Sequence, residues 1–314
     1  MASILLFLAV IPVFVIYTYI YNKDKNKEPW GLLIKLFVLG IASCFLVLAV
    51  SEVVFKVIPF LGKELEYMSF FEIMAYAFIG VALIEELCKW IMVYFGSYHH
   101  KAYDEVYDGI VYCVYVSLGF AFFENLLYVF GEQSIVVGIS RGLLAVPGHA
   151  CDAVFMGYYL SLAKVYASQG KKDLERKNLV LSIIVPTILH GIYDFCLMSG
   201  IEVLILVFFV FVIVMYITAI KKIKLLASQC KQYHQYQNPY AYNNIQSAHT
   251  QTQSIPGYVN QNITQQAPGY VNQNYTQQPS NYTNQNNNLT NKYCSNCGTP
   301  VHGQFCGKCG ARQN

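Results

Sequence analysis

Long apolar runs dominate the first 225 residues of this 314-residue chain. A helix needs about 20 mainly apolar residues to cross the hydrocarbon core of a bilayer. Because backbone polar groups find no water in lipid, apolar runs of this length span membranes as helices. The sequence therefore predicts an all-α polytopic membrane protein with about seven transmembrane helices. The expected spans are roughly 3–21, 31–55, 69–95, 109–130, 134–164, 179–198 and 201–220.

The composition agrees with this fold class. Hydrophobic residues make up 55% of the chain and charged residues only 12%, whereas soluble proteins average about 25% charged residues. The net charge of +3 is too small to indicate nucleic-acid binding. We therefore expect the lipid bilayer, and no nucleic acid, among the partners of this chain.

Basic residues in the loops predict the orientation, since cytoplasmic loops carry an excess of Lys and Arg. The loops after the first, third, fifth and seventh spans are basic, whereas the intervening loops offer only Lys56 and Lys63. This alternation predicts a multi-pass cell-membrane protein with its N-terminus outside and its C-terminus in the cytoplasm. Pro147-Gly148 interrupts the fifth span, so a count of eight segments stays open.

Four of the expected helices carry ionisable residues at membrane depth. Each charge there costs at least about 2.5–3.5 kcal/mol on insertion scales, so such residues pair, line water or carry out chemistry. Counted at about 1.5 Å per residue, Glu85, Glu124, His149, His190 and Asp194 lie roughly 15–22 Å from the cytoplasmic helix ends. The sequence thus predicts one polar slab built from four helices.

These residues form four motifs in a recognisable order. The motifs are Glu85-Glu86-x-x-Lys89, Phe120-x-x-x-Glu124-Asn125, Pro147-x-His149 and His190-x-x-x-Asp194. Together they resemble the PrsW family of bacterial intramembrane peptidases, which is related to the CAAX prenyl endopeptidase and bacteriocin-processing superfamily. The resemblance covers about residues 70–200. It implies an endopeptidase that cleaves membrane-associated proteins, with regulatory substrates such as anti-sigma factors in the prototype branch.

Peptide hydrolysis needs an activated water, a stabilised oxyanion and a proton for the leaving amine. On this hypothesis either Glu85 or Glu86 is the general base. The other expected catalytic residues would tune the charge of the glutamates, stabilise the oxyanion or shuttle the proton, orient a histidine, or complete the polar wall of the site. They are Lys89, Glu124, His149, His190 and Asp194. Two chemistries stay open, a metal-free glutamate-type peptidase, which we favour, and a metallopeptidase that uses the two histidines and a glutamate as ligands.

Two other classes of function also fit membrane-depth charges. A proton- or ion-coupled transporter places carboxylates and histidines at the bilayer midplane. In a non-catalytic membrane scaffold, the same charges would only fix helix packing. The chain shows no evident inverted repeat, which disfavours the transporter.

The C-terminal part of the chain differs from the 1–226 transmembrane domain. Residues 227–292 are rich in Asn, Gln and Tyr and contain a twelve-residue repeat, which is typical of a disordered linker. Residues 293–312 contain two Cys-x-x-Cys-Gly turns, a spacing that predicts a small zinc ribbon with a structural Zn²⁺. The expected ligands are Cys294, Cys297, Cys306 and Cys309.

Overall fold

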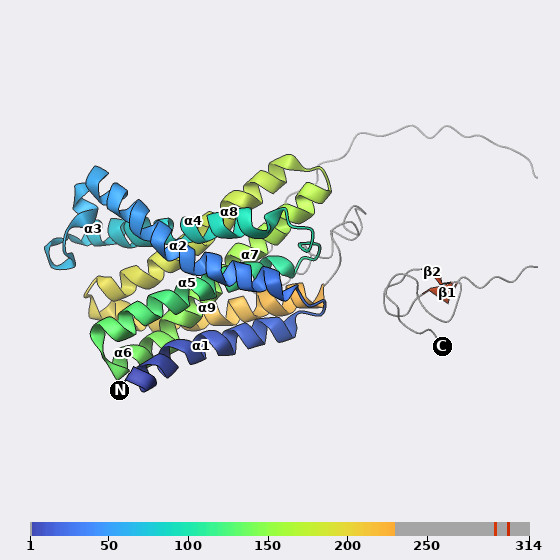
Figure 1. Cartoon of the computed structure of the whole chain (residues 1–314). Coiled ribbons are helices and arrows are strands. Elements are labelled where there is room, and N and C mark those ends of the chain that lie inside the picture. The colour runs from blue at the N-terminus through green and yellow to red at the C-terminus, as the bar shows by residue number, and fades with distance from the viewer. Residues whose placement is uncertain (1, 230–291, 294–299, 302–314) are drawn as a thin grey trace, which may run out of the picture. The chain divides into compact units, whose positions relative to one another are not determined.

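The computed structural model describes residues 2–229, 292–293 and 300–301. Residues 2–229 are mostly helical, and successive helical passes run up and down one bundle (Figure 1). The elements are α1 (Ala2–Lys23), α2 (Trp30–Val57), η1 (Pro59–Gly62), η2 (Leu65–Tyr67), α3 (Phe70–Ala75), η3 (Tyr76–Leu83), α4 (Ile84–Val93), η4 (Tyr94–Tyr98), α5 (Asp108–Glu132), α6 (Ile135–Ser140), η5 (Arg141–Ala145), α7 (Val146–Ser168), α8 (Lys172–Met198) and α9 (Glu202–Ser228).

Seven helical passes in residues 2–229 confirm the predicted fold class. Five of them, α1, α2, α5, α8 and α9, are long and apolar enough to cross a membrane as single α-helices. The third pass (70–98) and the fifth (135–168) are each continuous in the chain but combine α-helical and π-helical elements. Pro147 lies in the first turn of α7 and does not divide the fifth pass, so residues 2–229 make seven passes, not eight.

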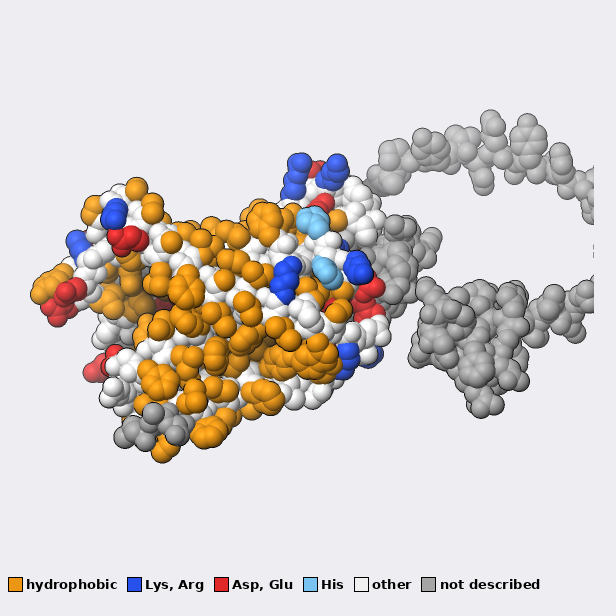
Figure 2. All heavy atoms as spheres, in the orientation of Figure 1, with side chains coloured by type: hydrophobic (Ala, Val, Ile, Leu, Met, Phe, Trp, Pro, Cys, Tyr) orange, Lys and Arg blue, Asp and Glu red, His pale blue; other side chains and the backbone are white. Residues whose placement is uncertain are grey.

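Helix α5 lies at the centre of the bundle. Every residue from Asp108 to Ala121 is buried, and α5 packs against α1, α2, α4 and α7. By contrast, many large hydrophobic side chains on α1, α2 and α9 are exposed, including Phe14, Leu48 and Leu206. Figure 2 shows apolar side chains covering the visible flank of the bundle, with charged side chains gathered towards its two ends. This distribution suits a bundle with lipid around its sides.

Glycines let the backbones of α2 and α7 approach α5 closely. A Cβ built on Gly119 of α5 would lie 2.0 Å from the carbonyl oxygen of Phe37 in α2, and Gly40 of α2 stands equally close to α5. On the other side, a Cβ on Gly157 of α7 would lie 2.3 Å from the carbonyl oxygen of Gly109. Contacts between small residues of this kind are a common basis of helix association in membranes.

The π-helical elements η3 and η5 each lie directly before a helix that carries site residues. Pro147, which follows η5, has no backbone N–H to donate to an earlier carbonyl. The hydroxyl of Tyr216 in α9 lies 3.2 Å from the carbonyl oxygens of both Leu143 and Leu144 and donates a hydrogen bond that the two oxygens share. An altered helical pitch at membrane depth is thus compensated by a side chain from another helix.

The loop between α1 and α2 buries two carboxyl groups. Glu28 is only 6% exposed, and its Oε2 accepts a hydrogen bond from the hydroxyl of Tyr112. Burial raises the pKa of Glu28 to about 7, although the Tyr112 hydrogen bond opposes this shift. Burial likewise raises the pKa of Asp24 to about 6. Ionisation of either group therefore opposes folding.

Near the C-terminus, β1 (Lys292–Tyr293) pairs with β2 (Pro300–Val301) in an antiparallel ladder. The four cysteines of the predicted zinc ribbon lie outside the described residues, as does most of the predicted 227–292 linker. Helix α9 continues to Ser228, two residues beyond the expected end of the transmembrane domain. The ribbon and the linker stay predictions.

We expect Gly119→Ala to destabilise the protein strongly, because the added methyl group would collide with the α2 backbone. Gly131 lies on the same helix, and a Cβ there would meet nothing within 4 Å. Gly131→Ala should therefore leave the thermal unfolding midpoint in detergent unchanged or slightly higher. Equal midpoints for the two variants would contradict the proposed close packing of α2 on α5.

We expect Glu28→Gln to raise the unfolding midpoint by about 5–10 °C more at pH 8 than at pH 5. The pKa of Glu28 in the folded protein is about 7, above the value of about 4.3 in an unfolded chain. The folded state therefore binds more protons between these values, and stability falls as pH rises through that window. Exposed Glu64 offers the control, Glu64→Gln; a Glu28→Gln gain of equal size at both pH values would contradict the account.

Candidate active site

The ammonium group of Lys89 lies at the centre of a buried polar cluster. It donates to Glu86 Oε1 at 2.8 Å and to Glu85 Oε2 at 3.2 Å, and it lies 3.2 Å from His149 Nδ1. It also stands 4.0 Å from the centre of the Phe120 ring. Glu85 and Glu86 precede Lys89 on α4 by four and three positions, so each carboxylate can reach the ammonium group.

The contacts of His149 define its tautomer. An ammonium group has no acceptor, so the Lys89 contact requires Nδ1 of His149 to be unprotonated. The other ring nitrogen, Nε2, lies 2.9 Å from Glu124 Oε2 and donates its proton there. His149 is thus a neutral imidazole fixed between a cation on α4 and a carboxylate on α5.

Arg141 joins the cluster from η5. Its Nη2 donates to the same Glu124 Oε2 at 2.7 Å, and its Nε donates to Asn125 Oδ1 at 3.2 Å. Its guanidinium carbon stands 3.9 Å from the ring centre of Tyr128. One carboxylate oxygen therefore holds both Arg141 and His149.

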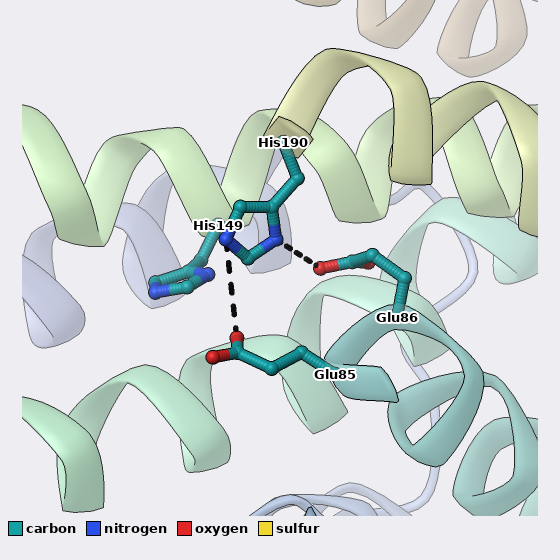
Figure 3. A group of neighbouring side chains, drawn as sticks. All are labelled: Glu85, Glu86, His149 and His190. Atoms are coloured by element: carbon teal, nitrogen blue, oxygen red, sulfur yellow. Dashed lines mark hydrogen bonds and ion pairs between the residues drawn. The ribbon is translucent and has the colours of Figure 1, made fainter. Parts of the chain in front are cut away.

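His190 of α8 lies among carboxylates. Its Nδ1 is 2.9 Å from Glu86 Oε1, and its Nε2 is 3.3 Å from Asp194 Oδ2 and 4.0 Å from Glu85 Oε2. Figure 3 shows the His190 ring above the two glutamates, with His149 beside it. A proton on either nitrogen of His190 therefore has a carboxylate to accept it.

The two glutamates differ in their access to the cavity of about 630 Å³ beside them. Glu86 is 1% exposed and is enclosed by Lys89 and His190. Glu85 is 8% exposed, has longer contacts and lines the cavity. Of the two, Glu85 is the carboxylate placed to meet a water or a peptide.

The cavity extends from the histidines towards one end of the bundle. Its walls include Ser51 and Phe55 near the end of α2, Tyr128 near the end of α5, and Met198 at the end of α8. In Figure 1 this is the end where the 58–69, 133–134 and 199–201 connections lie, opposite the connections 24–29 and 169–171. Apolar residues such as Val47, Leu144 and Leu197 form much of the wall.

All seven residues expected from the sequence to be catalytic belong to this one connected cluster. Two further residues of the site, Arg141 and Asp152, were not among the catalytic residues expected from the sequence. Asp152 is a buried residue of the cavity wall on α7. Asp152 follows His149 by three positions, so helical spacing alone indicated that the two share a face. Arg141 precedes His149 by eight positions, which in a regular α-helix would point the two about 80° apart. The π-helical pitch of η5 intervenes between them, and both side chains reach Glu124.

Four residues of the cluster have the chemistry of a metal site. Glu85, Glu86, His149 and His190 each offer one ligand atom, and these atoms lie within 4.8 Å of one another. Two imidazoles and two carboxylates are a familiar ligand set for zinc. However, the Lys89 ammonium already contacts three of these four residues.

The fold and the site define a class of protein: a polytopic helical membrane protein with a carboxylate–histidine site enclosed at membrane depth and open to a cavity. A family model described as "PrsW family intramembrane metalloprotease" matches residues 28–220. The chain therefore belongs to the PrsW family and is a membrane-embedded peptidase. The expected motif resemblance is confirmed, and neither the transporter nor the scaffold alternative finds support.

Individual relatives agree with the family match. The chain is 37% identical over 213 residues to Protease PrsW of Oceanobacillus iheyensis, an alignment that covers 68% of this chain and 91% of the relative. It is 32% identical over 233 residues to Protease PrsW of Clostridioides difficile, covering 73% of this chain and 93% of the relative. Protease PrsW of Bacillus subtilis is 37% identical over 181 residues, or 57% and 76% of the two chains. No solved structure matches the chain.

Proposed function

We propose that this peptidase is of the glutamate type and that Glu85 is the general base acting on the attacking water. The observation that carries this proposal is the difference between the two glutamates: Glu85 lines the cavity, whereas Glu86 is enclosed by Lys89 and His190. A general base must lie within hydrogen-bond reach of the water that it activates. Glu86 would then be the residue that positions Lys89 and His190.

The reaction follows from these positions. Glu85 takes a proton from water as the water oxygen bonds to the scissile carbonyl carbon. The Nε2–H of His190, which lines the cavity and has only the longer 3.3 Å contact with Asp194, stabilises the oxyanion. The C–N bond then breaks as Glu85 returns the proton to the leaving amine. Asp194 holds His190, and the Arg141–Glu124 pair holds His149.

The name of the family implies a metal, and the donor set of Glu85, Glu86, His149 and His190 fits one. A bound metal ion would supply Lewis-acid activation of water. Lys89 disfavours that alternative, because its ammonium contacts three of the four ligands and would repel a second cation. In this chain, the positive charge that holds the two glutamates together is the ammonium group of Lys89.

We also propose that substrates enter from outside the cell. The basic loops favour an extracytoplasmic N-terminus and a cytoplasmic C-terminus. In this orientation the cavity end near Phe55 and Met198 faces outwards. Single-span regulatory proteins of the anti-sigma-factor type are the substrates proposed, cut in the outer part of their membrane segment.

The C-terminal zinc ribbon is proposed to be separate from the chemistry. Four thiolates, from Cys294, Cys297, Cys306 and Cys309, complete a tetrahedral zinc site and leave no open position for substrate. The 227–292 segment would tether the ribbon, and the ribbon would recruit a substrate or partner. Deletion of residues 229–314 should then change which substrates are cut, with the membrane-embedded site intact.

We expect Glu85→Gln, Glu86→Gln and His190→Ala each to abolish cleavage of a single-span anti-sigma-factor reporter in liposomes. The three changes remove, in that order, the general base, the carboxylate that positions Lys89 and His190, and an oxyanion donor. Groups of this kind typically contribute factors of about 10²–10⁴ in rate. Lys63→Met, on an exposed ion pair away from the cavity, is the control that should cleave normally. Near-normal cleavage by Glu85→Gln, with Glu86→Gln inactive, would reverse the roles of the two glutamates.

Metal binding provides a separate measurement. In a full-length chain with the four ribbon cysteines changed to Ser, we expect no stoichiometric zinc and cleavage that resists chelators. The further change Lys89→Met should create a zinc site measurable by titration calorimetry, because it removes the ammonium but leaves all four ligands. Lys35→Met removes a lysine whose Nζ binds Gly96 O instead and should create no such site. Stoichiometric zinc in the parent chain that His190→Ala removes would establish the metallopeptidase.

A further inference from the structure

Asp152 is an acid of the site that has no hydrogen-bond or ion-pair partner in the described part of the chain. It lies on α7, one turn after His149, and lines the cavity while being only 4% exposed. Its Oδ1 is buried without a hydrogen-bond partner, and no salt bridge reaches its carboxyl group within residues 2–229. Its electrostatic neighbours include Glu86, Lys89 and His190, which places it in the same polar cluster.

The other carboxyl groups of the cluster all have partners. Glu85 and Glu86 bind Lys89, Glu124 binds Arg141 and His149, and Asp194 binds His190. Across the cluster, five carboxyl groups face only two permanently charged cations, Lys89 and Arg141. An unpartnered buried carboxyl destabilises the free protein, because it has lost water and gained no hydrogen bond in exchange. Within residues 2–229, Asp152 therefore adds no hydrogen bond or ion pair that would stabilise the free enzyme.

The substrate of an intramembrane peptidase brings the complementary group. A transmembrane helix must unwind locally before water can attack one of its peptide bonds, and unwinding frees main-chain N–H groups. At membrane depth, an N–H without an acceptor is costly. A carboxyl oxygen that faces the cavity without a donor meets this need, since both groups become paired in the complex.

We infer that Asp152 is a substrate-binding residue that accepts a hydrogen bond from a main-chain N–H of the unwound substrate, close to the scissile bond. This inference rests on the proposed function. Residues three positions apart on a helix have Cβ atoms about 5–6 Å apart, and an extended peptide advances about 3.3 Å per residue. The N–H bound by Asp152 therefore belongs to a residue one or two positions from the peptide bond beside His149.

Steady-state kinetics on the anti-sigma-factor reporter test this assignment. Asp152→Ala should raise KM about tenfold with kcat changed less than about threefold, because it removes binding common to ground and transition states. Asp152→Asn keeps an acceptor oxygen and should stay within about threefold of wild-type KM. Cys151→Ala, an adjacent buried position that does not line the cavity, is the matched control and should leave both constants unchanged.

Thermal unfolding separates a binding role from a structural one. Because Asp152 is unpartnered in the free enzyme, Asp152→Asn and Asp152→Ala should unfold at the wild-type temperature or above it. A lower midpoint with unchanged KM would make Asp152 a structural residue. A loss of kcat shared by Asp152→Asn would make it a proton-transfer group. Either result overturns the inference.

Single-atom changes in the substrate identify the bound N–H. Synthetic reporters in which one amide near the cleavage point is replaced by an ester lack one N–H at a time. At one position the ester should weaken binding to wild type about tenfold and have little further effect on Asp152→Ala, because the same hydrogen bond is already lost. Additive effects at every position would overturn the inference.

Binding to an inactive enzyme separates this inference from the proposed function. In a Glu86→Gln background, Asp152→Ala should weaken reporter affinity about tenfold whether or not cleavage is of the glutamate type. Failure of the wild type to cut any reporter would refute the proposed reaction. Unchanged affinity in this background, with cleavage by the wild type intact, would refute the role of Asp152 alone.

Discussion

The contact of one ammonium group with three acceptors from two helices organises the interior of this protein. Lys89 holds Glu85 and Glu86 on its own helix and fixes the tautomer of His149 on α7. Through Glu86 it also sets the position of His190 on α8. Carboxylates this close together would repel one another in a low dielectric without a cation between them. The paired glutamates and the shared polar slab both depend on this lysine.

The packing of the bundle makes that contact possible. Polar groups at membrane depth must find partners within the protein, so the helices that carry them have to approach closely. Gly40 and Gly119 bring α2 against α5, and Gly109 and Gly157 bring α7 against α5. With α5 fixed on both sides, Glu124 meets His149 and Arg141 at hydrogen-bonding distance.

The sequence predicted the parts of this structure that follow from regular periodicity and apolar length. Seven spans were visible as apolar runs, and spacings of three or four residues placed Glu85 with Lys89 and His190 with Asp194. The π-helical turns were not visible, because no local residue pattern reports a change of pitch that tertiary contacts stabilise. Arg141 escaped prediction for this reason. Asp152 escaped because it belongs to none of the recognised motifs and has no partner among the described residues to indicate its role.

The π-helical turn of η5 has a further consequence. A π-turn is, in effect, a helix with one residue added, and loss of that residue would restore regular pitch without breaking the helix. With seven positions left between Arg141 and His149, a regular α-helix would turn through about 700° and point the two side chains only about 20° apart. Both would then still face the oxygen of Glu124 that they now share. Chain length and helical pitch are therefore coupled in this stretch: eight positions need the π-helical turn, whereas seven would not. Natural variation here should lose or gain one residue only together with the π-helical turn.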